Sequence, residues 1–330
     1  MGKKTGCVSA LNTVYRNVRK TGELYRDMLS QAQSFNKYYA RLTGGKEQVA
    51  TLVVFYAHQI EKGLSHLSFR IGFGKDPLRN LSCAMTRMRE LDDEYVSSDA
   101  YRMALGALHE YMERNACSVE AMEYLSCTFP QEVLKEAKAA TDGFGGSLEI
   151  ERESIGEGLF TRVIQGRHSI REFSGAPVTR EELEIALDEA MRSPSACNRQ
   201  PTRVRVLLDS DRIEKALRIQ GGFGGYDLPP ALLLITADYR CFVGPQERNE
   251  GFIDAGMFAM TLLYALEDQN LAACPLNTMM HKREEMATRS LLEVPEWETL
   301  VMYIAVGHFP RTVKTCQSRR LSASDITTFL

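Results

Sequence analysis

The pattern of apolar residues changes at one short segment of the chain, and this change limits the possible folds more than any other feature. Residues 141–147 read Thr-Asp-Gly-Phe-Gly-Gly-Ser, and no helical or strand periodicity runs through them. Glycine-rich segments of this kind are typical of linkers. A chain of 330 residues is also longer than one average domain. We therefore predict a helical N-terminal domain over residues 1–145 and a second domain over residues 150–330.

Residues before this segment show helical patterns alone. Apolar side chains recur at spacings of three and four, which is the signature of helices that bury one face. Gly44 and Gly45 interrupt the pattern once, and Ser98 is placed to cap a helix after a second break. The predicted helices cover residues 13–42, 46–62, 82–115 and 118–140. The sequence assigns no role to this domain.

After the linker, strand patterns alternate with helix patterns, which predicts a layered α/β or α+β domain. The predicted strands cover residues 203–208, 231–237, 271–275 and 300–306, and the predicted helices cover residues 180–192, 211–219, 250–269 and 281–292. Thr179 and Glu182 form a capping box at the start of the first helix. The helix 250–269 is apolar nearly all round, so we expect it to be buried on every side. Asp254 within it then needs a partner, either a neighbouring arginine or a helix end.

Charge and cysteine usage argue against several classes of function. The formal net charge of −3 gives no general attraction to nucleic acid or to an anionic membrane, so neither partner is expected. The apolar run 52–57 is far too short to span a bilayer, and the N-terminus has no signal-peptide pattern. The eight cysteines form no Cys-x-x-Cys pair and have no histidine at metal-ligand spacing. We expect reduced thiols, no metal site and a cytoplasmic location.

A polar loop joins a helix to a strand at residues 193–201. Pro194 ends the helix, and the loop then offers the hydroxyl of Ser195 and the amides of Asn198 and Gln200. An amide both donates and accepts hydrogen bonds, which suits recognition of a flat heterocycle whose edge alternates C=O and N–H groups. An ordinary turn rich in Asn and Ser explains the same residues, and the loop alone does not decide between the two interpretations.

A second polar cluster lies upstream, where residues 167–171 read Arg-His-Ser-Ile-Arg. Arg167, Ser169 and Arg171 alternate, so they share one face of an extended chain. Two guanidinium groups and a hydroxyl on one face form a cradle for a phosphate group, because arginine donors match phosphate oxygens in pairs. A solvated basic face is the alternative for each arginine taken singly.

The chain resembles the nitroreductase-like FMN flavoproteins over roughly residues 155–330. The resemblance rests on the two polar clusters at their spacing of about thirty residues, and on two further segments. One segment is Pro275-Leu276-Asn277, where the family implies that a backbone N–H of Asn277 hydrogen-bonds flavin N5. The other contains Arg319, which the family implies near the FMN phosphate.

The resemblance implies an α+β fold with a mixed sheet flanked by helices, and a homodimer that binds FMN between its subunits at the helix 250–269. It also implies a reaction in which hydride passes from NADH or NADPH through the flavin to a small conjugated acceptor, such as a quinone or a nitro compound. No catalytic acid or base is assigned. The implied FMN contacts are Arg167, His168, Ser169, Arg171, Pro194, Ser195, Asn198, Gln200, Pro275, Leu276, Asn277 and Arg319.

Two alternatives remain open. A specialised biosynthetic oxidoreductase of the same fold would select its substrate with the N-terminal helices. A flavin-binding or flavin-free scaffold without activity is the other alternative, because this chain has Gln317 where many family members have a basic residue, and Thr202 where they have a tryptophan.

Overall fold

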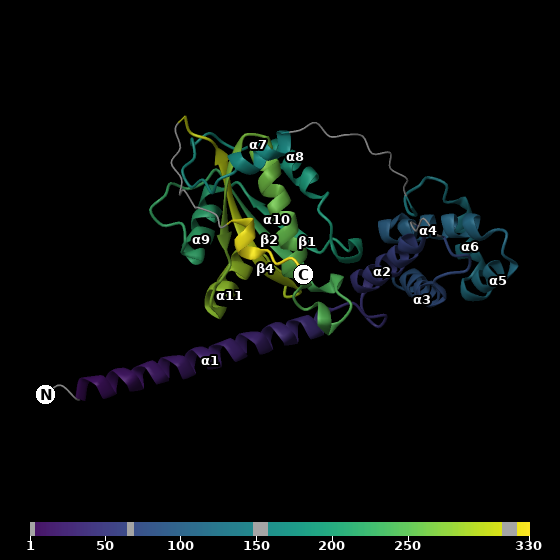
Figure 1. Cartoon of the computed structure of the whole chain (residues 1–330), viewed down its shortest axis with the longest axis horizontal. Helices are drawn as coiled ribbons and strands as arrows, with labels where there is room; N and C mark the ends of the chain where they lie inside the picture. The colour runs from purple at the N-terminus through teal and green to yellow at the C-terminus, as the bar shows by residue number, and fades with distance from the viewer. Residues whose placement is uncertain (1–3, 65–68, 148–157, 312–321) are drawn as a thin grey trace.

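A computed structural model describes residues 4–64, 69–147, 158–311 and 322–330. It contains a helical region followed by a region of helices and strands (Figure 1). The helices of the first region are α1 (Lys4–Tyr38), α2 (Lys46–Leu64), α3 (Lys75–Leu91), α4 (Asp99–Asn115), α5 (Val119–Thr128) and α6 (Gln131–Ala139), with a short 3-10 helix at Tyr95–Ser97. Helix α1 extends away from the rest of the molecule (Figure 1).

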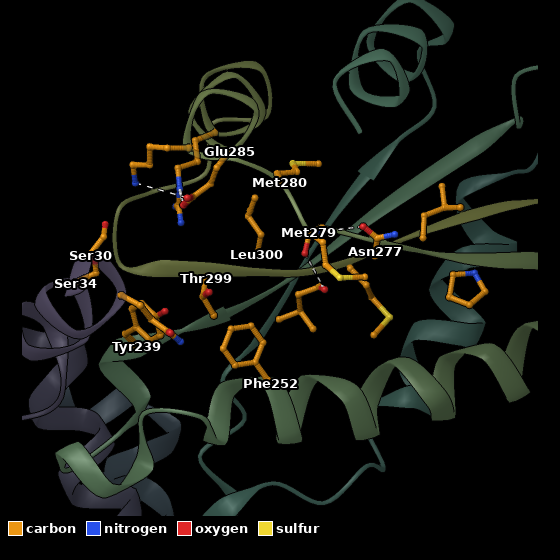
Figure 2. A pocket seen from close by; sticks show the side chains of 18 residues that line it. Ser30, Ser34, Tyr239, Phe252, Asn277, Met279, Met280, Glu285, Thr299 and Leu300 are labelled. Atoms are coloured by element: carbon orange, nitrogen blue, oxygen red, sulfur yellow. Dashed lines mark hydrogen bonds and ion pairs between the residues drawn. The ribbon is translucent and has the colours of Figure 1, made fainter. Parts of the chain in front are cut away.

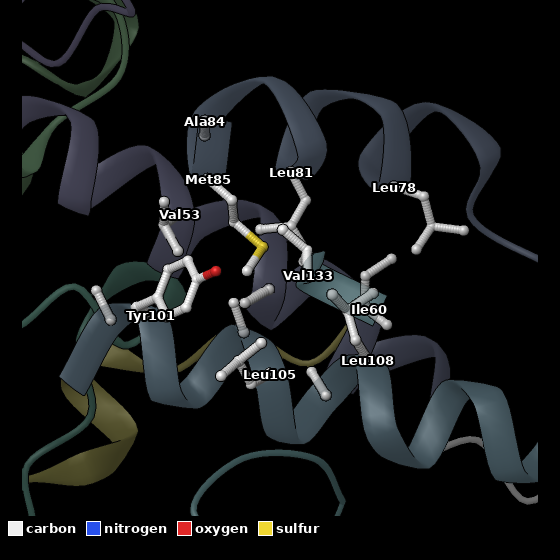
Figure 3. Close-up of a cluster of buried hydrophobic side chains, with 14 of the residues drawn as sticks. Val53, Ile60, Leu78, Leu81, Ala84, Met85, Tyr101, Leu105, Leu108 and Val133 are labelled. Carbon is white, nitrogen blue, oxygen red and sulfur yellow. The ribbon is translucent and has the colours of Figure 1, made fainter. Parts of the chain in front are cut away.

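Helices α2, α3, α4 and α6 enclose one hydrophobic core (Figure 3). Their apolar residues recur at helical spacing, so one face of each helix points inward. Leu81 and Met85 on α3 and Leu108 on α4 are fully buried in this core. Burying each such side chain contributes about 1.5–3 kcal/mol, and the helical region therefore has a substantial core of its own.

The structure contains the predicted helices of this region, with three changes. Helix α1 begins at Lys4 and ends at Tyr38, whereas the prediction was 13–42. Helix α3 begins at Lys75, earlier than predicted. Residues 118–140 form two helices and not one, because Pro130 cannot continue a helix and holds Phe129 in an extended conformation. Ser98 takes the N-cap position of α4, as expected, although its side chain makes no capping hydrogen bond.

The second region contains α7 (Leu159–Gly166), α8 (Arg180–Ala190), β1 (Thr202–Leu207), α9 (Ser210–Gln220), β2 (Ala231–Asp238), α10 (Glu250–Asp268), β3 (Leu271–Asn277), α11 (Lys282–Leu291), β4 (Glu298–His308) and α12 (Ala323–Ile326). Short 3-10 helices lie at Ala196–Asn198, Tyr239–Cys241 and Pro245–Glu247. The predicted strands and helices are present, and their bounds shift by a few residues at most. The capping box of Thr179 and Glu182 is formed as predicted.

The four strands that the structure describes form one sheet in the order β1-β2-β4-β3, and every neighbouring pair is antiparallel. The α+β class is therefore confirmed. Among the described residues, the expected mixture of parallel and antiparallel pairing is confined to one parallel bridge between Ser169 and Ala273. Strand β1 ends at Leu207, which pairs with Leu232 near the start of β2. The chain therefore re-enters the sheet at the end where it left, and the two strands run antiparallel.

Helices cover both faces of this sheet. One hydrophobic core joins the sheet to α8 and α10, and a second core joins the opposite face to α9 and α11. In a single chain, α10 still presents part of its surface to solvent, since Phe252 is 39%, Ile253 52% and Met257 37% exposed. The prediction that this helix is buried on every side is therefore wrong for one chain, because the sheet and α8 cover only its inner face.

The segment 141–147 packs on α4, and a glycine substitution tests this contact. A Cβ atom added to Gly106 would lie 2.5 Å from the backbone nitrogen of Gly145. Gly106→Ala should therefore lower the free energy of unfolding by about 1–3 kcal/mol, measured by urea or thermal unfolding.

Gly22→Ala is the matched control, because Gly22 also lies inside a helix but has no atom within 4 Å of the added Cβ. It should be neutral or stabilising, since alanine favours a helix by about 0.5–1 kcal/mol over glycine. Equal stability of the Gly106→Ala variant and the parent protein would contradict the described packing.

Candidate functional site

Residues 167–171, the phosphate cradle, run along the outer edge of β3. Arg167 follows the last residue of α7, and its N–H donates to the carbonyl of Val163 at 3.0 Å. Ser169 then forms the parallel bridge to Ala273, and the N–H of Ile170 donates to the Ala273 carbonyl at 3.0 Å. Ile170 is buried, whereas Arg167, Ser169 and Arg171 are half-buried. The chain is therefore held in an extended form with its polar side chains partly accessible.

Glu267, in the last turn of α10, faces the phosphate cradle. A Cβ atom added to Gly166 would lie 2.7 Å from its Oε1 atom. Partial burial raises the pKa of Glu267, and the nearby charges of His168 and Arg167 oppose that rise. No sequence pattern indicates this neighbour, because an acidic residue in the last turn of a helix is otherwise an ordinary surface residue.

Local hydrogen bonds fix two of the cradle side chains. The carbonyl of Gly166 lies 2.7 Å from Nδ1 of the exposed His168 and accepts a hydrogen bond from it. The Arg171 guanidinium donates to the carbonyl of Ser169 at 3.4 Å, which is a weak contact at that length. Arg171 therefore keeps most of its donors for another partner.

The β3 turn, Pro275-Leu276-Asn277, lies on the same strand as Ala273 and is therefore close to the phosphate cradle. The side chain of Gln220 donates to the carbonyl of Asn277 at 3.1 Å, and Oδ1 of Asn277 accepts from the N–H of Met279 at 3.0 Å. A cavity of about 640 Å³ opens beside this turn (Figure 2). Its lining includes Ser30, Gln31 and Ser34 of α1, Phe252 of α10, and Thr299 and Leu300 of β4.

Residues 194–200, the amide loop, have an unusual backbone. Cys197, Asn198 and Gln200 have φ angles of 51°, 54° and 48°, in the left-handed region that non-glycine residues rarely adopt. The hydroxyl of Ser195 accepts from the N–H of Gln200 at 2.9 Å, and the Gln200 side chain donates to the Asn198 carbonyl at 3.1 Å. Pro194, Asn198 and Gln200 are exposed. The loop therefore presents its two amide side chains at the surface.

Asp254 of α10 accepts a backbone hydrogen bond from the amide loop. Both of its carboxylate oxygens accept from the N–H of Ala196, at 3.1 and 3.2 Å. The residue is 2% exposed, and burial raises its pKa to about 6, although the hydrogen bond from Ala196 opposes the rise. Ala196 begins the 3-10 helix Ala196–Asn198, so the partner of Asp254 is an N–H at a helix end, as expected, and the nearby charge of Arg199 favours the carboxylate.

One chain brings together the phosphate cradle and the β3 turn but not the amide loop. The loop leads into β1, and two strands lie between β1 and β3. Neighbouring strands are about 4.8 Å apart, so the loop and the cradle are separated by roughly 19 Å across the sheet. Glu267 beside the cradle and Asp254 below the loop are thirteen residues apart on α10 (267 minus 254), about 20 Å along the helix. Arg319 lies outside the described residues.

The comparisons with known proteins bear on this region. Residues 164–221 and 220–308 match the model of the Nitroreductase family. Over these matched residues, the chain is a member of the Nitroreductase family. The matched range contains the phosphate cradle, the amide loop and the β3 turn.

Individual relatives are distant. The protein named FMN reductase (NAD(P)H) of Bacillus subtilis (strain 168) is 26% identical over 155 residues, which cover 42% of this chain and 61% of the relative. The 4-nitrobenzoate reductase of Nocardioides sp. (strain LMS-CY) is 26% identical over 199 residues, which cover 45% of this chain and 80% of the relative. The solved structure of B. megaterium NfrA2 has 22% identity and a TM-score of 0.47, and the match covers 51% of this chain and 73% of NfrA2.

Two further findings concern the described residues. No helix among them is long and apolar enough to cross a membrane. Within the same residues, no group of three or more His, Cys, Asp or Glu side chains is arranged to hold a metal ion.

The raised pKa of Asp254 predicts how stability depends on pH. The folded protein keeps this proton up to about pH 6, whereas the unfolded chain loses it near pH 4, so the cost of burying the charge develops between these values. Asp254→Asn keeps an oxygen acceptor for Ala196 and removes the charge. Its unfolding free energy relative to the parent protein should therefore increase from pH 4 to pH 7, by up to about 3 kcal/mol.

Chemical denaturation at several pH values measures this difference. Asp188→Asn serves as the control, because Asp188 is exposed on α8 and its substitution should give a flat difference. A flat difference for Asp254→Asn as well would show that its carboxylate is not buried as described.

Proposed function

We propose that this protein is an FMN-dependent oxidoreductase that takes hydride from NADH or NADPH and delivers it to a conjugated electrophile, such as a quinone or a nitro compound. The main support is the bridge between Ser169 and Ala273, because it joins the phosphate cradle to the β3 turn within the family-matched range. The names of the relatives, an FMN reductase and a 4-nitrobenzoate reductase, agree with this assignment.

The residues of the phosphate cradle fit the FMN phosphate in charge. Arg167 and Arg171 would hold the phosphate through paired guanidinium contacts, and the hydroxyl of Ser169 would add a donor. Arg319 would contact the same phosphate. The cavity beside Asn277, about 640 Å³, is within the range typical of cofactor sites.

The chemistry of hydride acceptance and delivery belongs to the bound flavin. The protein orients the ring and supplies hydrogen-bond donors, including the backbone N–H of Asn277, where negative charge develops. Pro275 and Leu276 would pack against the ring from the same turn. This scheme needs no side-chain nucleophile.

The separation of the amide loop from the cradle supports a homodimer. Phe252, Ile253 and Met257 leave an apolar strip of α10 exposed in one chain. A second copy that covers this strip would bring its own amide loop to the cradle of the first. Pro194, Ser195, Asn198 and Gln200 of one chain would then complete the flavin site of the other.

A specialised acceptor is the second candidate function. Ser30, Gln31 and Ser34 of α1 line the cavity beside Asn277, so the helical N-terminal domain that we propose for residues 1–145 would help to select the acceptor. The acceptor would then need to match polar groups of α1 as well as the flavin ring. A screen of acceptors against the parent protein and a Gln31→Ala variant distinguishes this candidate from a general reductase.

The purified protein should show a flavin absorption spectrum, with FMN and not FAD identified by mass.

Two variants test the flavin site. Arg167→Ala removes a charge-assisted contact, so the Kd for FMN should rise roughly tenfold to a hundredfold, and the Kd for riboflavin, which lacks the phosphate, should change much less. Asn198→Ala should weaken FMN and riboflavin by similar factors. If Arg167→Ala weakens riboflavin as much as FMN, Arg167 does not hold the phosphate.

A charge on the exposed strip of α10 tests the homodimer. Ile253→Glu should convert a species of about twice 37.1 kDa into a monomer in analytical ultracentrifugation, because a carboxylate cannot be buried unpaired in an apolar interface. The same variant should lose at least about tenfold in FMN affinity, since each site needs both chains. Ile71→Glu is the matched control, because Ile71 is 58% exposed and lies in the helical region. A monomeric parent protein that binds FMN would refute the shared site.

A further inference from the structure

Arg199 differs from its neighbours in the amide loop. Within the described stretch 193–200, it is the one buried residue, with 7% of its surface exposed. Asn198 and Gln200 on either side of it are exposed. The buried side chain of Arg199 therefore lies between two exposed amide residues in the sequence, and its position constrains Asn198 and Gln200.

The Arg199 guanidinium closes the loop and ties it to the body of the protein. Its Nε donates to the carbonyl of Ala196 at 2.8 Å. Its two terminal nitrogens donate to the two carboxylate oxygens of Glu247, at 2.8 and 3.0 Å. The same carboxylate accepts from the N–H of Val243 at 2.7 Å. A forked pair of this kind fixes orientation as well as distance.

Two aromatic rings contact the same guanidinium. Phe55 of α2 has its ring centre 5.5 Å from Cζ of Arg199, and Phe242 has its ring centre 5.6 Å away. Both distances are within the range of cation–π attraction. Phe55 belongs to the helical region and precedes Arg199 by 144 residues (199 minus 55). The helical region therefore contacts the amide loop directly.

The backbone of the loop needs such support. Cys197, Asn198 and Gln200 all have positive φ angles, and none of them is glycine. A left-handed conformation is strained for these residues and persists only where surrounding contacts enforce it. Arg199, at φ −78°, has ordinary geometry and carries the buried contacts.

We propose that Phe55 and Arg199 are positioning residues through which helix α2 holds the amide loop in its strained form, and so sets how Asn198 and Gln200 contact the flavin ring. The proposal deepens the proposed function and rests on it. Under this proposal, the helical region affects the affinity and the reduction potential of the bound flavin.

Phe55→Ala tests the proposal, and Phe69→Ala is the matched control. Phe69 is also a half-buried aromatic residue of the helical region with an arginine over its ring, since Cζ of Arg114 lies 4.1 Å from its centre. Both variants should lower the melting temperature to a similar degree. Arg199→Lys, which keeps the charge and loses the forked pair with Glu247, is a third variant that tests how Arg199 anchors the loop.

The first measurement needs no flavin. The alkylation rate of Cys197 in flavin-free protein, followed by peptide mass spectrometry, reports the conformation of the loop, and exposed Cys83 is the internal control. Phe55→Ala and Arg199→Lys should each accelerate alkylation of Cys197 by about threefold to tenfold. Phe69→Ala should leave the rate unchanged. Equal Cys197 rates in Phe55→Ala and Phe69→Ala would overturn the proposal.

The second measurement uses the flavin-bound protein. Phe55→Ala should weaken FMN and riboflavin by the same factor, about threefold to tenfold, and shift the reduction potential of FMN in the same direction as Asn198→Ala. Phe69→Ala should change neither quantity. If Cys197 reacts faster in Phe55→Ala while affinity and potential stay at parent values, the link from loop to flavin is refuted. If the parent protein binds no flavin, the proposed function fails, and the Cys197 rates still decide whether α2 holds the loop.

Discussion

The complete burial of strand β2 is the constraint on which the rest of the α+β region depends. All of its residues are removed from solvent, so helices must cover both faces of the sheet. Helices α8 and α10 cover one face, and α9 and α11 cover the other. Because helices cover both faces, the polar clusters of the candidate site lie at the edges and ends of the sheet. The phosphate cradle and the β3 turn lie at the β3 edge, and the amide loop lies at the β1 edge.

This arrangement underlies our proposal that a single chain holds only part of the flavin site. Glu267 and Asp254 mark two positions along α10, one beside the cradle and one below the amide loop. Both carboxyl groups have raised pKa values, because Asp254 is buried and Glu267 is partly buried. The charge of Glu267 would oppose an anionic phosphate at the cradle, whereas the nearby guanidinium of Arg167 has the opposite sign and would attract it. The exposed strip of α10, formed by Phe252, Ile253 and Met257, lies close to Asp254 in the helix, and we propose that a second chain completes the site there.

The helical region is connected to this site by contacts of two kinds. Helix α1 contributes Ser30, Gln31 and Ser34 to the cavity beside the β3 turn. Helix α2 contributes Phe55 to the surroundings of Arg199. The first kind bears on which molecule enters the cavity, and the second bears on the shape of the loop. The helical region therefore has its own core and also contacts two parts of the candidate site.

The sequence by itself determined the local structure and the chemical types at the site. Periodicity and the capping box of Thr179 and Glu182 predicted the strands and most helices, because these depend on neighbours within a few residues. The sequence also showed that the cradle and the amide loop are clusters of polar residues. Only the tertiary structure decided that those clusters lie at opposite sheet edges, that α10 is exposed on one side, and that Phe55 contacts Arg199. Each of these depends on long-range packing between residues far apart in the chain, which local patterns do not encode.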